Sequence, residues 1–243
     1  MFSDLALYCA IMFCATIAGG MVTLVWRWSD ERLHLFISFG AGIFLGAVFG
    51  HLLPEVMGRA HGHQAGLYIL AGFLLIFFVE RILLHREGGG HHHGHLVVSL
   101  TVLIGLSVHS LMEGFGLAIV MSDKDLAEVL LLSILAHKVP AAFSLVSLMV
   151  LAQQSRKRVW AGLLIFAATA PVGALVLGPI FNYGRAGALW QFTGIVTGSF
   201  LYVATADLLP EAFHSRRRRW VNLLLMLGGI TLMSWLGSDA GHH

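Results

Sequence analysis

Apolar runs about as long as a lipid bilayer is thick recur along the whole sequence. They lie near residues 5–26, 33–56, 66–86, 96–121, 126–152, 158–178, 188–213 and 219–238. An α-helix of about 20 residues crosses roughly 30 Å of hydrocarbon. Only 12% of the residues are charged, against about 25% in an ordinary soluble domain. The sequence therefore predicts an all-α polytopic membrane protein with eight transmembrane helices.

The connectors between these runs are short, so residues 1–243 are predicted to form a single transmembrane domain. With eight crossings, most basic connector residues fall on one side: Arg27, Arg32, Arg81, Arg86, Arg156, Lys157, Arg158 and Arg216, Arg217, Arg218 and Arg219. The other side holds Arg59, Lys124 and Arg185. Because basic connectors stay in the cytoplasm, both termini are predicted to be extracytoplasmic. The four consecutive arginines are expected to lie at anionic lipid rather than on nucleic acid.

A short sequence repeats in the second and seventh runs. Leu-Leu-Pro-Glu occurs at residues 52–55 and again at residues 208–211. On the predicted topology the two copies face opposite sides of the membrane. Equal motifs in opposite orientation suggest an inverted repeat of helices 1–3 and 6–8, with helices 4 and 5 as a central pair. Such repeats are common in transporters, which hold their site near the bilayer midplane.

Ionisable side chains near the membrane centre occur in the fourth and fifth runs. His109 and Glu113 are four residues apart, so they share one helix face, and His137 and Lys138 lie at a similar depth in the next helix. An uncompensated charge at mid-bilayer costs about 2.5–3.5 kcal/mol. Two imidazoles and a carboxylate are suitable ligands for a divalent ion such as Zn²⁺. Pro140 is expected to free a backbone carbonyl beside this site or to serve as a hinge, and an ordinary kink in a membrane helix is the alternative.

Further histidines and glutamates lie where an ion would enter or leave. A possible entrance on the outer side comprises His51, Glu55, His61 and His63. A possible exit on the inner side comprises His91, His92, His93, His95, Glu211 and His214. Residues 87–95 are predicted to form a His-rich cytoplasmic loop. Its composition is typical of weak metal binding, and an inert solvated loop is the alternative.

Three other interpretations of the central cluster remain open. It could be a buried polar network that ties helices together without an ion. It could belong to an intramembrane zinc-dependent hydrolase, in which the metal activates water; Asp207 is the candidate further ligand for that chemistry. It could also be a metal sensor that transports nothing.

The motifs resemble those of the Zrt/Irt-like (ZIP) family of divalent-metal transporters over nearly the whole chain. The resemblance is carried by His109-Ser110-Leu-Met-Glu113-Gly114, by His137-Lys138-Val-Pro140-Ala-Ala-Phe, and by Leu201-Tyr-Val-Ala-Thr followed by Leu-Leu-Pro-Glu211. It implies zinc uptake into the cytoplasm, a 3+2+3 helix arrangement, a homodimer and an elevator-type movement. It assigns the transport site to His109, Glu113 and His137, with Zn²⁺ as substrate and no separate cofactor. A plasma or inner membrane is the expected location, with an organelle membrane as the alternative.

The sequence departs from the family pattern beside this site. Many members bind two metal ions through further carboxylates, where this chain has Ala141 and Ala170. Lys138 stands at another position of the second site. We therefore expect one ion, with the Lys138 ammonium replacing the second ion's charge near Glu113. Water, a carbonyl oxygen or Ser110 is expected to complete the coordination. Two histidines and one glutamate do not distinguish Zn²⁺ from Fe²⁺, Mn²⁺ or Cd²⁺.

Overall fold

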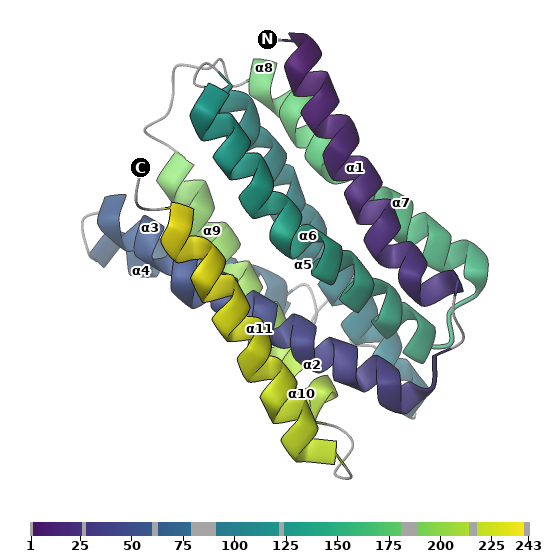
Figure 1. The fold of residues 1–243 in the computed structure, drawn as a ribbon. Helices are drawn as coiled ribbons and strands as arrows, with labels where there is room; N and C mark the ends of the chain where they lie inside the picture. Colours follow the sequence, from purple (N-terminus) through teal and green to yellow (C-terminus); the bar gives the residue numbers. More distant parts are fainter. Residues whose placement is uncertain are drawn as a thin grey trace.

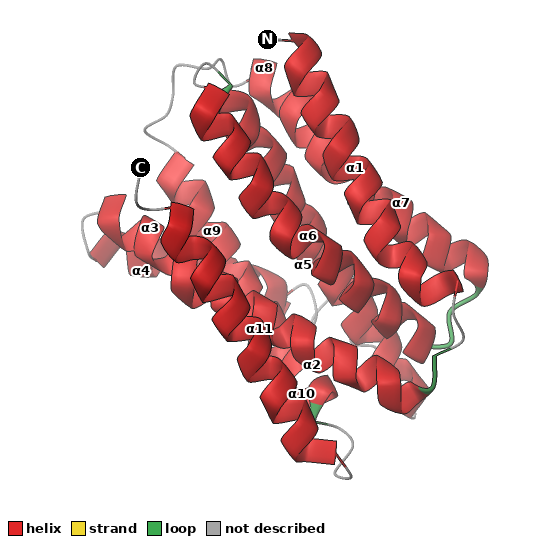
Figure 2. Ribbon diagram, in the orientation of Figure 1, coloured by secondary structure: helices red, strands yellow, loops and turns green. Residues whose placement is uncertain are grey.

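The computed structural model describes residues 2–25, 28–59, 63–78, 91–121, 124–180, 189–213 and 218–240. Within these residues the regular secondary structure is entirely helical, as Figure 2 shows. Single helices are α1 (Phe2–Val25), α4 (His63–Phe78), α5 (His91–Val120), α6 (Lys124–Leu151) and α11 (Arg219–Ala240). Helices continued through a π-helical segment are α2 (Asp30–Ala47) to α3 (Leu53–Arg59), α7 (Arg156–Val172) to α8 (Gly178–Ile180), and α9 (Leu189–Tyr202) to α10 (Leu209–Ala212).

Five of the described helical stretches are long and apolar enough to cross a membrane. They are Ser3–Val25, Asp30–Gly58, Val98–Val120, Leu130–Leu151 and Arg156–Leu177. α4 is a shorter apolar helix. Large apolar side chains also cover the outside of the bundle; Val25, Leu132 and Leu224 are 66–68% exposed. Such a surface fits lipid rather than water. The prediction of a helical membrane protein is confirmed, whereas eight spans remain a prediction.

The helices pack as two groups of four (Figure 1). We call α1, α5, α6 and α7 the first group, in which α1 packs along α6 and α5 packs along α7. The second group contains α2, α4, α9 and α11, in which α2 packs along α11 and α4 along α9. The groups meet where α2 crosses α6 and where α5 lies against α9. One apolar core, which includes Phe44, Leu145 and Phe200, continues across this boundary.

Three π-helical segments interrupt the long helices, and each lies close to a proline. They span Val48–Leu52, Gly173–Leu177 and Val203–Leu208. Proline has no N–H group and its ring clashes with the carbonyl four residues earlier, so a regular α-helical hydrogen bond is lost there. The wider turn restores pairing: the Leu53 N–H donates to the Val48 carbonyl, and the Leu209 N–H donates to the Ala204 carbonyl. Both copies of Leu-Leu-Pro-Glu therefore begin at the end of a π-helical segment.

The predicted loop over residues 87–95 is wrong for the part of it that the structure describes. His91, His92, His93 and His95 lie within the first turn and a half of α5. Histidine and even one glycine cost only about 1 kcal/mol or less in a helix, and extending an existing helix adds one hydrogen bond per residue. The helix formed by the apolar run that follows therefore begins earlier, within the His-rich segment. Residues 79–90, which include the end of the predicted third helix, lie outside the described residues.

Candidate metal site

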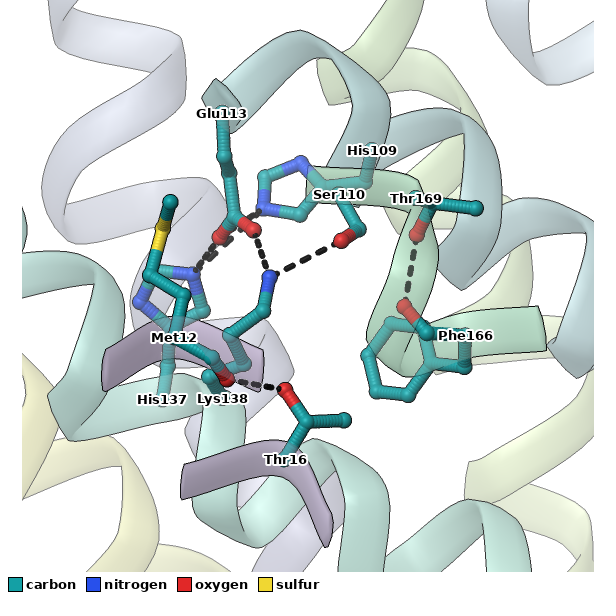
Figure 3. Close-up of polar contacts among 9 residues, drawn as sticks. All are labelled: Met12, Thr16, His109, Ser110, Glu113, His137, Lys138, Phe166 and Thr169. Carbon is teal, nitrogen blue, oxygen red and sulfur yellow. Dashed lines mark hydrogen bonds and ion pairs between the residues drawn. The ribbon is translucent and has the colours of Figure 1, made fainter. Parts of the chain in front are cut away.

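The central residues of the predicted site come together inside the first group of helices. His109 and Glu113 project from one face of α5, and His137 and Lys138 project toward them from α6 (Figure 3). The four-residue spacing stacks the first two side chains one above the other. All four side chains are largely buried, from 1% exposed for Lys138 to 12% for His137. Ionisable groups this far from water need partners close by.

Three potential ligand atoms converge on one point. The Nε2 atoms of His109 and His137 lie 3.4 Å apart, and His109 Nε2 lies 3.0 Å from Glu113 Oε1. His137 Nε2 also contacts Glu113 Oε1 directly. Ligands at about 2.0–2.2 Å from a tetrahedral Zn²⁺ ion lie roughly 3.3–3.5 Å from one another. The two imidazole nitrogens have this spacing, whereas Glu113 Oε1 lies closer to both of them than a bound zinc ion would hold it.

The second oxygen of Glu113 has a different partner. Lys138 Nζ lies 2.5 Å from Glu113 Oε2 and donates a second hydrogen bond to Ser110 Oγ at 2.9 Å. The aliphatic part of Lys138 is enclosed, and its ammonium lies 5.5 Å from the centre of the Phe166 ring, within the range of a cation–π contact. One carboxylate thus links a candidate metal position to the side-chain nitrogen of Lys138.

Ser110 and Pro140 follow candidate site residues closely in the sequence. Ser110 is fully buried and its hydroxyl accepts from Lys138, so it supports the ammonium rather than the candidate metal position. Pro140 lies inside α6, which remains helical on both sides of it.

Aromatic residues around the site were not anticipated from the sequence. The Phe200 ring of α9 lies against the His109 imidazole with 3.7 Å between ring centres. Met12 of α1 is completely buried. His109 Nδ1 is buried and has no hydrogen-bond partner among the described residues. These contacts come from helices distant in sequence, and no local spacing signals them.

The possible entrance residues that the structure describes lie outside the cluster. His51 belongs to the π-helical segment after α2, and its buried Nε2 has no hydrogen-bond partner in the described part of the chain. Glu55 and His63 are exposed on α3 and α4, and His61 lies outside the described residues. Among the described residues, the one group of three or more possible ligands that converges is His109, Glu113 and His137.

Glu211, whose side chain is described, is also separate from the cluster. Glu211 is 7% exposed in α10, and the His34 ring approaches it: Nδ1 lies 3.0 Å from the Glu211 carbonyl oxygen and 3.5 Å from Oε1. His34 was not singled out from the sequence. Asp207, the further ligand considered for a hydrolase, is buried in the π-helical segment after α9. The His91–His95 side chains and His214 lie outside what is described.

Comparisons with known proteins match most of the chain. The family model described as ZIP Zinc transporter matches residues 4–96 and 84–237. Zinc transporter ZIP9 of Micropogonias undulatus is 30% identical, over 86% of this chain and 85% of its own length. Zinc transporter ZIP9 of Xenopus tropicalis is 28% identical, over 86% and 85% of the two chains. Zinc transporter ZIP1 of Homo sapiens is 28% identical, over 85% and 78%.

Proposed function

This chain belongs to the ZIP zinc transporter family, and we propose that it carries one Zn²⁺ ion at a time into the cytoplasm. It is an integral membrane transporter of divalent metal, with zinc as its substrate, and the alternative of an intramembrane hydrolase is not favoured. We assign His109, Glu113 and His137 as the transport-site ligands. The observation that carries this assignment is the convergence of two imidazole nitrogens and one carboxylate oxygen in a buried position.

The division of Glu113 between two partners supports a single ion. Oε1 faces both imidazoles, while Oε2 is 2.5 Å from the Lys138 ammonium. A second divalent ion bound through Oε2 would meet a buried positive charge, and like charges repel strongly where water is excluded. Ala141 and Ala170 supply no further ligand. Lys138 thus provides the charge that a second ion would otherwise provide.

The pairing of helices supports the inverted repeat. The proposed repeat exchanges the first three spans (α1, α2 and α4) with the last three (α7, α9 and α11), and the fourth span (α5) with the fifth (α6). This exchange converts the packed pair α2–α11 into the packed pair α9–α4. It also converts the α1–α6 pair into the α7–α5 pair. All four pairs are major contacts of the fold. The π-helical segments that precede the two Leu-Leu-Pro-Glu motifs are exchanged in the same way. We therefore propose eight spans in a 3+2+3 arrangement.

The glycines make different contacts within the helix groups and between them, and this difference supports movement of one group against the other. A methyl group added at Gly114 would lie 1.9 Å from the Ala170 carbonyl oxygen, and one at Gly72 would lie 1.8 Å from that of Ile195. Both contacts lie within a group. Further backbone approaches within groups occur at Gly19, Gly42, Gly173, Gly198 and Gly229. Close backbone packing of this kind holds membrane helices together.

Across the boundary, the glycines meet side chains instead. Gly40 faces the Ser144 hydroxyl, and Gly105 faces the Val203 methyl group. We propose that the first group carries the ion in an elevator-type movement along the second. The contact between His109 and Phe200 crosses the boundary, so it has to break when the site moves. The proposal also includes transport toward the cytoplasm and a homodimer. It places the entrance at His51, Glu55 and His63 and the exit at Glu211.

Zinc uptake into proteoliposomes tests the ligand assignment. We expect Glu113→Ala and His137→Ala each to lower uptake at least about tenfold, because each removes one of three side-chain ligands. Glu128→Ala removes an exposed carboxylate from α6 outside the site and should leave uptake close to that of the unaltered protein. Undiminished uptake in both site variants would refute the assignment.

Anomalous scattering at the zinc edge tests the number of ions. We expect one peak, between His109 Nε2, His137 Nε2 and Glu113 Oε1. Two neighbouring peaks between α5 and α6 would contradict the proposal that Lys138 replaces a second ion, without bearing on the three ligands themselves.

A further inference from the structure

A cavity of about 410 Å³ lies at the boundary of the two helix groups, away from the metal site. It is found at the end of the bundle where α1 is joined to α2 and α6 to α7. Its apolar walls come from both groups, through Leu24, Leu33, Val150 and Val159. The volume is within the range of roughly 300–1,000 Å³ that is typical of small-molecule sites.

Polar groups occupy one part of the lining. Thr23 is 4% exposed, and its buried Oγ1 has no hydrogen-bond partner among the described residues. Arg156 also lines the cavity, and Nη2 of its guanidinium donates to the Leu24 carbonyl oxygen at 3.3 Å. A guanidinium has five N–H donors, so this contact leaves donors for a ligand. A buried hydroxyl without a protein partner remains available to hydrogen-bond a ligand or a water molecule.

The connector between α6 and α7 holds a third polar side chain in the lining. Gln153 adopts a left-handed conformation with φ of 52°. The N–H of Gln153 donates to Val150 and that of Gln154 to Met149, which closes the end of α6. Gln154 then turns toward α5, where its Nε2 donates to Ser99 Oγ at 2.7 Å. The amide of Gln154 is therefore held in the wall of the cavity.

The cavity lies at the depth where lipid headgroups are expected. Trp28 lines it, with its indole N–H on the Val22 carbonyl, and Trp160 is 37% exposed one turn into α7. Tryptophan is enriched at the membrane–water interface. Arg156, Lys157 and Arg158 are all exposed beside it. Basic residues at this level attract anionic lipid.

We propose that this cavity binds the phosphate headgroup of an anionic phospholipid. The Arg156 guanidinium and the Thr23 hydroxyl donate to phosphate oxygens, while the glycerol and first methylene groups contact Leu33 and Val150. A guanidinium can bind a phosphate group through paired hydrogen bonds. None of the described lining residues carries a carboxylate, imidazole or thiol, so a divalent cation would find neither ligands nor favourable charge there. This proposal does not depend on the transport site.

Native mass spectrometry of the full-length protein tests the proposal. The protein is released from nanodiscs of phosphatidylcholine that contain a minority of phosphatidylglycerol, and retained lipid is identified by mass. We expect the unaltered protein to retain phosphatidylglycerol. Arg156→Gln should lower its retention about tenfold or more, as the loss of a charge-assisted hydrogen bond predicts. Thr23→Val, which keeps the side-chain shape, should lower it several-fold.

Lys157→Gln is the matched control, because it removes the same charge from the neighbouring residue, which does not line the cavity. It should retain phosphatidylglycerol as the unaltered protein does. Equal retention in the Arg156, Thr23 and Lys157 variants would overturn the proposal, since binding would then reflect general attraction to the basic surface. A parallel sample in pure phosphatidylcholine with inorganic phosphate distinguishes the sources. Retention of phosphate in place of lipid would also overturn the proposal.

Discussion

Glu113 is the residue on which the site depends, because its two carboxylate oxygens serve different partners. Oε1 faces the two imidazoles and Oε2 faces Lys138. The spacing of His109 and Glu113 was sufficient to predict that both lie on one face of α5. It could not predict which oxygen would meet the ammonium, since that depends on side-chain torsions in a packed interior. The stacking of Phe200 on His109 was equally beyond a local pattern.

Replacing one member of the Glu113–Lys138 pair should destabilise the protein more than replacing both members. Lys138→Met leaves a buried carboxylate without its cation, and Glu113→Gln leaves the ammonium without its anion; each should cost about 3–5 kcal/mol of unfolding free energy. The double variant removes both charges, so it should be far less destabilised than the sum of the two. Unfolding of the purified, zinc-free protein measures this. Additive losses would mean that the two groups do not interact.

At the scale of single helices, proline and glycine decide the local geometry. Pro54 and Pro210 follow π-helical segments whose hydrogen bonds reach back five residues. The repeated motif predicted a relation between these two helices, but not the wider turn before each copy. Helix ends were predicted less well, as the helical His91–His95 segment illustrates. Where a helix begins depends on how far it extends from residues that are already helical, rather than on the composition of the terminal segment alone.

The contact of α5 with α7 provides a sharp test at this scale. Gly114→Ala would place a methyl group 1.9 Å from the Ala170 carbonyl oxygen, which belongs to a helix backbone and cannot turn aside. We expect a loss of stability of at least about 1–3 kcal/mol and lower zinc uptake, because Glu113 is the adjacent residue. Gly116→Ala is the control, since no neighbouring atom of the described residues lies within 4 Å of its added methyl group. Equal thermal stability of the two variants would contradict this account of the packing.

At the scale of the whole molecule, the boundary between the two helix groups is the surface expected to slide. A cysteine pair at Gly40→Cys and Ser144→Cys would bridge α2 and α6, because the two Cβ atoms would lie 3.2 Å apart, near the usual disulfide separation of about 3.5–4.5 Å. Cys9 and Cys14 are replaced by alanine in this background. We expect oxidation to abolish most zinc uptake and reduction to restore it.

A pair at Gly194→Cys and Tyr68→Cys serves as the control for this experiment. It joins α9 to α4 within one group, where the two Cβ atoms would lie 2.8 Å apart. Its oxidation should leave uptake largely unchanged. If the α2–α6 disulfide forms completely and uptake persists, the two groups do not move against each other during transport.

The sequence by itself determined the class of the protein and the chemical types at its site. Apolar runs of membrane length and a four-residue spacing of ligands are local properties, and a helix expresses them wherever it packs. Only the tertiary structure decided how α2 pairs with α11, how Lys138 shares Glu113, and how Thr23 comes to line a cavity with Arg156. These relations join residues far apart in the chain. They follow from how the surfaces of packed helices fit together, which the residue pattern of a single segment cannot predict.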